Sequence, residues 1–236
     1  MRINKENFYM NEDKFLNKKE AKFIVFEGLD GSGQSTQSNL LKNFLIKKKI
    51  KVILTKEPTS VSQAGKKIKA ILSEKIKIDP KKLQKLFAED RKWHLENIII
   101  PSLKKNKWVI SDRYFFSSFA YGASEGIDLR WLIKINKNFL FPDLTFILKV
   151  KPQICILRIE KRGAEKTFFE KKEKLEKVFS IYKTFPNKFR NIVLINGEKK
   201  KQEVFKDIKK IIVSNFLENN NNLKKILKNY KKICIK

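Results

Sequence analysis

The sequence predicts an α/β protein, a three-layer sandwich in which a five-stranded parallel sheet carries helices on both faces. Five short apolar runs alternate with longer stretches of helical spacing, as expected for parallel strands joined by crossover helices. A glycine-rich turn follows the first run, and folds of this kind bind ligands at the carboxyl ends of their strands. The chain has 236 residues, 42% of them hydrophobic, which suffices for one α/β core.

The strands are predicted from nearly continuous apolar segments, the pattern of strands buried on both faces. They lie at 22–27, 52–55, 109–111, 144–150 and 192–196. Helices are predicted at 35–49, 63–72, 80–104, 115–123, 129–139, 152–161, 168–185 and 202–217. We therefore expect one domain over residues 21–217.

Both ends of the chain differ from this pattern. Residues 1–20 mix charge and asparagine without a sustained period, which predicts a flexible N-terminal extension. Residues 218–236 begin with a polar, asparagine-rich break and continue with apolar residues at helical spacing, which predicts a basic C-terminal tail or helix. That segment could bind nucleic acid, a membrane surface or a partner. We favour a C-terminal helix that is packed on its own domain or frayed, because only the charge argues for binding.

The glycine-rich turn matches the phosphate-binding pattern G-x-x-x-x-G-K-[ST] at every position except the lysine. Its glycines let successive backbone N–H groups point inward, and the following helix adds its positive N-terminal end. A purely structural turn is the alternative, but the strand before it and the hydroxyl residues after it favour phosphate binding. The predicted fold is thus a P-loop NTPase sandwich, with an ATP site formed by Gly28, Leu29, Asp30, Gly31, Ser32, Gly33, Gln34, Ser35 and Thr36.

Gln34 occupies the position of the loop lysine. A glutamine amide can donate a hydrogen bond to a phosphate but cannot neutralise its charge. Part of the electrostatic contribution is therefore missing or comes from other cations. Ser35 closes the motif and is the natural Mg²⁺ ligand.

The formal net charge of +29 raises the question of nucleic-acid binding. Only seven of the 54 basic residues are arginines, and the lysines are scattered through every predicted element. Dispersed lysine is typical of a solvated surface, since base and phosphate recognition usually exploit the bidentate arginine. We expect non-specific attraction of nucleic acid at low salt and no specific nucleic-acid partner.

The remaining composition predicts a cytoplasmic protein without a membrane partner. No apolar stretch approaches the roughly 20 residues of a membrane span, and residues 1–20 lack the apolar centre of a secretory signal. Cys155 and Cys234 are predicted to be free thiols in a reducing compartment.

Four further motifs, in a fixed order along the chain, identify a family. The segment S-D-R-Y-F-F-S-S-F-A-Y resembles the D-R-Y-x-x-S-S-x-A-Y motif of thymidylate kinases, and L-F-A-E-D-R resembles their F-A-x-x-R segment. T-K-E-P-T is similar to T-R-E-P, F-P-D-L-T matches the P-D-L-T strand entry, and a further stretch resembles the lid region. The S-D-R-Y segment lies at 111–121, the L-F-A-E-D-R segment at 86–91 and T-K-E-P-T at 55–59. F-P-D-L-T lies at 141–145 and the lid-like stretch at 158–170. The whole resemblance covers roughly residues 22–217.

This resemblance implies transfer of the γ-phosphoryl group of ATP to dTMP, giving dTDP and ADP, with Mg²⁺ as the metal. A kinase for another nucleoside monophosphate is the alternative within the class. An alternative of a different class is a catalytically weak nucleotide-binding protein whose basic surface attracts nucleic acid. The oligomeric state is open, and a homodimer is one arrangement.

The resemblance also implies a dTMP site. Phe87 and Arg91 are four residues apart and share a helix face. The resemblance implies that this ring stacks on thymine and that this guanidinium bonds the carbonyl edge of the base. Ordinary core packing is the alternative for Phe87. The residues implied to bind dTMP are Asp30, Lys56, Phe87, Arg91, Arg113, Ser118 and Tyr121.

Catalytic roles are implied for Asp112 and Arg113, where the guanidinium clamps the acceptor phosphate and the carboxylate lies in the magnesium shell. Their alternative is a surface ion pair. Asp30 is implied to reach the sugar 3′-hydroxyl. Glu27 could serve either the magnesium–water network or a structural hydrogen bond.

Some thymidylate kinases carry a catalytic arginine inside the phosphate loop, and others supply it from the lid. Residues 29–32 contain no arginine, so this chain resembles the lid-supplied type, and the resemblance implies catalytic cations in the lid. The candidates are Arg158, Arg162 and Lys166, for which a solvated helix face is the alternative. His94 is predicted to be a surface or helix-packing residue. Two further positions depart from the family pattern, since Gly122 replaces the usual glutamine after Tyr121 and Lys56 replaces an arginine.

Overall fold

The sheet of the computed structural model has five parallel strands in the order β2-β3-β1-β4-β5. The structure describes residues 21–73, 76–161, 163 and 172–218. The strands are β1 (Phe23–Gly28), β2 (Val52–Lys56), β3 (Trp108–Asp112), β4 (Leu144–Lys149) and β5 (Ile192–Asn196). The predicted fold and its five strands are confirmed, with each strand boundary within one residue of its predicted position.

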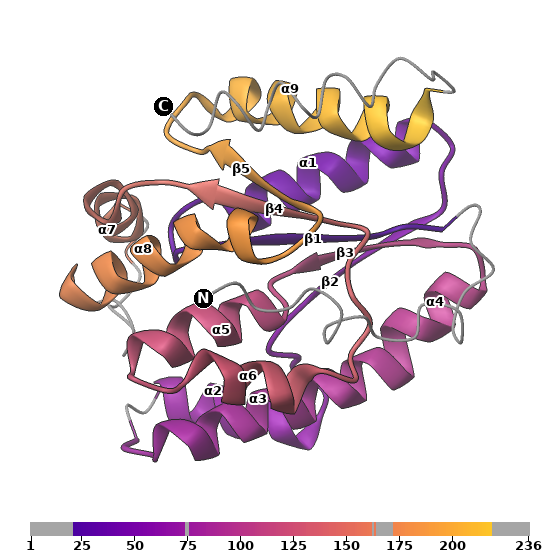
Figure 1. The fold of residues 1–236 in the computed structure, drawn as a ribbon. Coiled ribbons are helices and arrows are strands. Elements are labelled where there is room, and N and C mark those ends of the chain that lie inside the picture. Colours follow the sequence, from indigo (N-terminus) through magenta and orange to yellow (C-terminus); the bar gives the residue numbers. More distant parts are fainter. Residues whose placement is uncertain (1–20, 74–75, 162, 164–171, 219–236) are drawn as a thin grey trace.

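Helices cover both faces of this sheet (Figure 1). They are α1 (Gln34–Lys47), α2 (Gln63–Ser73), α3 (Pro80–His94), α4 (Ile100–Lys104), α5 (Phe115–Ser124), α6 (Leu129–Asn136), α7 (Pro152–Glu160), α8 (Lys172–Lys188) and α9 (Lys201–Ile212). Two π-helical turns, η3 (Leu95–Ile99) and η4 (Val213–Leu217), continue α3 and α9. The helix predicted at 129–139 ends earlier, at Asn136, and residues 168–171 of another predicted helix lie outside the described residues.

The central strand β1 divides the core into two layers because its side chains alternate between the faces. Ile24 and Phe26 pack into the cluster that α1 and α9 cover, whereas Phe23 and Val25 pack into the cluster beneath α3, α5 and α8. Figure 1 shows α1 and α9 on one side of the sheet and α3 and α5 on the other. Every residue of β1 is buried, so the loop after it starts from a rigid support.

The start of α3 has a local sequence cause. The Asp79 side chain accepts a hydrogen bond from the backbone N–H of Lys82 at 2.8 Å, and Pro80 occupies the first turn, where its missing N–H costs nothing. This cap fixes the beginning of the helix that carries one wall of the site.

The predicted extension at 1–20 lies outside the described residues, as do residues 219–236 of the predicted tail. Among the described helices, none combines the length and the apolar character that a membrane crossing requires.

Candidate functional site

The donor loop, defined here as Gly28–Thr36, connects the end of β1 to the first turn of α1. Gly31 has φ +82°, and a β-carbon there would lie 2.5 Å from the carbonyl oxygen of Cys155 in α7. Gly33 precedes α1 with φ +102°. Only glycine adopts these conformations without strain, so both residues are needed for the loop to curl and for α7 to approach it.

Gln34 turns its side chain into the donor loop. Its Nε2 donates to the carbonyl oxygen of Gly28 at 2.8 Å, and the residue is buried. The amide therefore braces the loop backbone in a role that carries no charge. Ser35 and Thr36 are exposed at the N-terminal end of α1.

Arg113 links the donor loop to the neighbouring pocket. Its Nη1 donates to the Gly28 carbonyl at 3.1 Å and to Ser117 Oγ at 2.9 Å, and its Nη2 contacts Asp30 Oδ1 at 2.7 Å. Its φ of +75° lies in the left-handed region, which is uncommon for a residue other than glycine and is often found at functional sites. The surface ion pair considered as the alternative for this residue does not describe it, because the Arg113 side chain is largely buried, although it pairs with the partly exposed Asp30.

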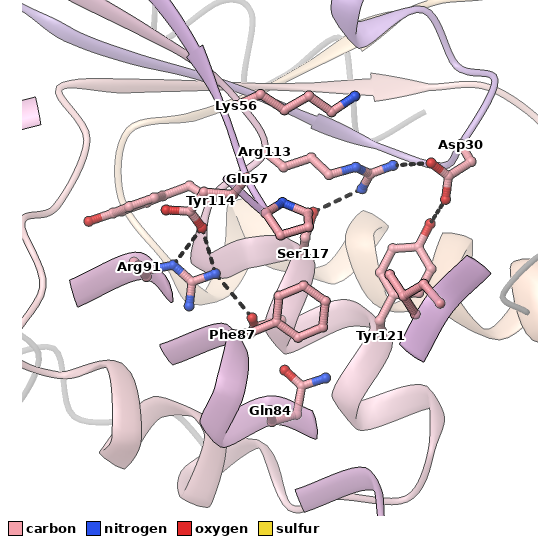
Figure 2. A pocket seen from close by; sticks show the side chains of 13 residues that line it. Asp30, Lys56, Glu57, Gln84, Phe87, Arg91, Arg113, Tyr114, Ser117 and Tyr121 are labelled. Atoms are coloured by element: carbon pink, nitrogen blue, oxygen red, sulfur yellow. Dashed lines mark hydrogen bonds and ion pairs between the residues drawn. The ribbon is translucent and has the colours of Figure 1, made fainter. Parts of the chain in front are cut away.

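The acceptor pocket, named here for its predicted ligand, lies beside the donor loop. Figure 2 shows Asp30, Arg113 and Tyr121 on one side of it and Phe87 and Gln84 on the α3 side. Tyr121 donates its hydroxyl to Asp30 Oδ2 at 3.0 Å. The lining residues are Asp30, Lys56, Glu57, Pro58, Leu72, Gln84, Phe87, Arg91, Arg113, Tyr114, Ser117, Ser118 and Tyr121. All seven residues predicted to bind dTMP are therefore brought together in one cavity.

Phe87 is half-buried, so it both packs against the core and lines the pocket. Lys56 lies at the end of β2, with a side chain that is 61% exposed and an Nζ 3.5 Å from Asp112 Oδ2. Figure 2 shows the exposed cation of Lys56 and the ring of Phe87 at different ends of the cavity, as a nucleotide with a phosphate and a base would require.

Arg91 is held by protein partners at the base of the pocket. Its Nη2 pairs with Glu57 Oε2 at 2.8 Å and contacts Ser118 Oγ at 3.2 Å, while Nη1 donates to Asn136 Oδ1 at 2.6 Å. Both members of the Arg91–Glu57 ion pair are buried. The role of Arg91 as a base contact stays a prediction, and the structure adds an ion pair that the sequence did not indicate.

His94 extends the same network. It is fully buried, with Nδ1 3.0 Å from Glu57 Oε1 and Nε2 2.6 Å from Thr55 Oγ1. The surface position considered for His94 is wrong, because the Glu57 carboxylate recruits the imidazole to the inside of the fold. A buried acid that already holds an arginine gains a second partner in this way.

Glu27 at the end of β1 forms a second buried cluster. Its carboxylate accepts from the N–H of Tyr114 at 2.9 Å, from the Ser117 hydroxyl at 2.5 Å and from the Tyr182 hydroxyl at 3.0 Å. Burial raises the pKa of Glu27 to about 7, although these hydrogen bonds and Arg113 act in the opposite direction. The contacts match the structural alternative for Glu27, and through Ser117 they reach Arg113.

Ser35 and Asp112 fit a hard divalent cation. The Ser35 hydroxyl lies 2.5 Å from Asp112 Oδ2, so a hydroxyl and a carboxylate meet at the mouth of the donor loop. Oxygen ligands of this kind suit Mg²⁺, which commonly takes one or two protein oxygens together with substrate phosphates. Asp112 is buried and faces this position, so the surface ion pair considered for it is also wrong.

Arg158 of α7 lies against the back of the donor loop. Its Nη1 is 3.4 Å from the Ser32 carbonyl oxygen, and its Nη2 donates to the Gly197 carbonyl at 3.1 Å. The solvated helix face considered for Arg158 is therefore wrong, because backbone carbonyls position the guanidinium. The other two lid candidates, Arg162 and Lys166, lie outside the described residues.

Several residues of the site were missed by sequence reasoning. Glu57 belongs to the T-K-E-P-T segment, so an acid flanked by motif residues was an available signal. Asn136, Tyr182 and Gln84 belong to no motif, and only the packing of distant helices brings them to the site.

A phosphate-binding loop lies beside a pocket whose two arginines, Arg91 and Arg113, are each paired with a carboxylate. This combination defines a nucleotide-binding α/β protein of the phosphotransferase class. The comparisons with known proteins narrow this class. A family model described as Thymidylate kinase matches residues 26–208. A probable thymidylate kinase of Pyrococcus horikoshii is 39% identical over 191 residues, which cover 79% of this chain and 93% of that protein.

Two other relatives agree. A probable thymidylate kinase of Methanocaldococcus jannaschii is 40% identical over 186 residues, covering 79% of this chain and 93% of that protein. A thymidylate kinase of Caldicellulosiruptor saccharolyticus is 35% identical over 198 residues, covering 82% and 96% respectively. The chain therefore belongs to the thymidylate kinase family.

Proposed function

We propose that this protein transfers the γ-phosphoryl group of ATP to the 5′-phosphate of dTMP. A phosphate oxygen of dTMP attacks the γ-phosphorus, the bond from that phosphorus to the bridging oxygen breaks, and ADP leaves. The observation that supports this proposal best is Arg113, which bonds the Gly28 carbonyl and Asp30 of the donor loop and itself lines the acceptor pocket. A single guanidinium thus lies where the donor loop and the acceptor pocket meet.

In this proposal the chain contributes positioning and charge rather than covalent chemistry. The donor loop amides hold ATP, Arg113 and Lys56 hold the acceptor phosphate, and Phe87 stacks on the base. Ser35 and Asp112 hold Mg²⁺, which when bound neutralises charge on the transferred phosphoryl group.

The remaining assignments concern the sugar, the base side and the lid. In this proposal Asp30 faces the sugar, and Ser118 and Tyr121 line the base side with Arg91. Arg158 supplies positive charge from α7. Arg162 and Lys166, which lie outside the described residues, are assigned to the lid on the resemblance alone. A cytoplasmic location and a homodimeric assembly remain predictions, and the sedimentation of the purified protein tests the assembly.

The test is ADP release, measured by a coupled assay with ATP, Mg²⁺ and one acceptor at a time. We expect dTMP to give the highest kcat/KM among dTMP, dUMP, UMP, CMP and GMP. A higher value for any other acceptor would contradict the assignment to dTMP, and release of ADP with no acceptor dependence would contradict a kinase.

A further inference from the structure

One face of α3 presents three residues to the acceptor pocket. Gln84, Phe87 and Arg91 stand at positions i, i+3 and i+7, so they share a stripe along the helix, and all three line the cavity. Figure 2 shows Gln84 with its amide end toward the ring of Phe87. Gln84 and Arg91 therefore flank the aromatic ring, one helical turn to either side.

Arg91 and Gln84 differ in whether their polar atoms already have hydrogen-bond partners in the protein. Arg91 already holds Glu57, Asn136 and Ser118. The Oε1 atom of Gln84 is buried and has no hydrogen-bond partner among the described residues, and the whole residue is only 4% exposed. A buried acceptor without a donor is costly, so such an atom in a ligand pocket points to a donor on the ligand.

Gly122 of α5 borders Gln84 and packs closely against Leu132. A β-carbon at position 122 would lie 3.4 Å from the Gln84 amide carbon and 2.8 Å from a methyl carbon of Leu132. The space that a side chain on α5 would need is therefore filled from α3 and α6.

We propose that Gln84 is a specificity-determining residue whose carboxamide binds the polar edge of the pyrimidine base, with Oε1 accepting the N3–H of thymine. A carboxamide offers a donor beside an acceptor, which complements a ring N–H next to a carbonyl oxygen. A base stacked on Phe87 lies between Gln84 and Arg91, so both ends of its polar edge meet protein groups. The assignment rests on the proposed function, because it takes dTMP as the ligand of this pocket.

The test compares dTMP with its N3-methyl derivative, which lacks the donor hydrogen. Binding is measured by calorimetry and turnover by ADP release, for the natural protein and for Gln84→Leu. We expect Gln84→Leu to raise the Kd and KM for dTMP about tenfold, the loss of one buried hydrogen bond, with a smaller change in kcat. The preference for dTMP over the N3-methyl compound should shrink at least fivefold.

Gln37 provides a matched control. It is a buried glutamine on α1 whose Oε1 also has no partner among the described residues, but it lines no part of the acceptor pocket. Gln37→Leu should leave the preference between the two ligands unchanged. Thermal melting shows whether each variant folds, and Gln84→Met replaces Gln84→Leu in the same comparison if the latter does not fold.

The outcomes separate the two proposals. An unchanged preference for dTMP in a folded Gln84 variant overturns the role of Gln84 while turnover by the natural protein still supports the kinase. Binding of dTMP without turnover in the natural protein contradicts the proposed function, and the calorimetric preference then still decides the role of Gln84.

Discussion

The donor loop and the acceptor pocket lie side by side, but they are built from different parts of the chain. The donor loop is one continuous segment whose shape depends on backbone geometry at Gly31 and Gly33. The acceptor pocket is built from side chains of separate elements that are already paired, as Arg91 is with Glu57 and Arg113 with Asp30.

This difference predicts how each region responds to substitution. Backbone amides remain when a side chain changes, so the donor loop can keep its shape with glutamine in the lysine position. In the pocket, removing Arg91 leaves the buried Glu57 carboxylate without its counter-charge. We therefore expect substitutions in the donor loop to lower the turnover rate, and substitutions of paired residues in the acceptor pocket to lower the free energy of unfolding.

The largest effect should follow Arg91→Ala. The Glu57 carboxylate is buried and would keep only His94 as a side-chain partner among the contacts described for it. Removing one member of a buried ion pair typically costs about 3–5 kcal/mol. Urea denaturation should show a decrease of that size in the free energy of unfolding.

Lys92→Ala is the matched control for that variant, since Lys92 is the next residue on α3 and is exposed. It should change the free energy of unfolding by less than about 0.5 kcal/mol. Equal losses in the two variants would mean that the ion pair contributes no more than an exposed lysine.

Glu27 joins the two regions, and its titration should make stability depend on pH. Because burial raises its pKa to about 7 in the folded state, above the ordinary value of 4.5, the folded protein binds a proton that the unfolded chain has released. This contribution is complete below about pH 4.5 and is lost as pH rises through about 7, amounting to roughly 3 kcal/mol.

The measurement is the free energy of unfolding of the natural protein and of Glu27→Gln at pH 5, 6, 7 and 8. Glutamine cannot ionise, so the difference between the two proteins isolates Glu27 from the other titrating groups. The natural protein should lose stability relative to the variant as pH rises. A difference that is constant over this range would show that Glu27 stays in one protonation state.

The contrast between a continuous loop and a pocket built from distant elements also explains which features the sequence could predict. The strands follow from runs such as Phe23–Phe26, because burial on both faces leaves a local apolar signature, and the donor loop is contiguous. The pairing of Glu27 with Tyr182 joins residues 155 positions apart, and that of Arg91 with Asn136 joins residues 45 apart. Such pairings depend on how helices pack, and no local pattern encodes them.

Motif residues were predicted to be near the ligand, and the structure brings the dTMP set into one pocket. The motifs could not predict which hydrogen-bond partners each side chain already has in the protein without a ligand. Arg91 looked like an open hydrogen-bonding fork in the sequence, whereas its guanidinium is already bonded to three residues. Gln84 is the reverse case: it belongs to no motif, and its buried Oε1 atom has no hydrogen-bond donor among the described residues.

The smallest expected effect is a coupling between Gln34 and Arg158 across the donor loop. Gln34 donates to the Gly28 carbonyl, and Arg158 is bonded to the carbonyls of Ser32 and Gly197. Among the predicted lid cations, Arg158 is therefore the one that the described residues place beside the donor loop. We expect Arg158→Ala to lower kcat about tenfold to a hundredfold and Gln34→Lys to raise it no more than about tenfold.

If Arg158 supplies the missing charge, its removal should matter less once a lysine is present. The double variant Gln34→Lys/Arg158→Ala should then retain about tenfold more activity than the product of the single effects, a coupling of about 1.4 kcal/mol. Arg130→Ala, at an exposed position on α6, should show no coupling with Gln34→Lys. Strictly additive effects of Gln34→Lys and Arg158→Ala on kcat would mean that the loop works without a replacement cation from α7, and that its amides and bound Mg²⁺ carry the donor phosphates.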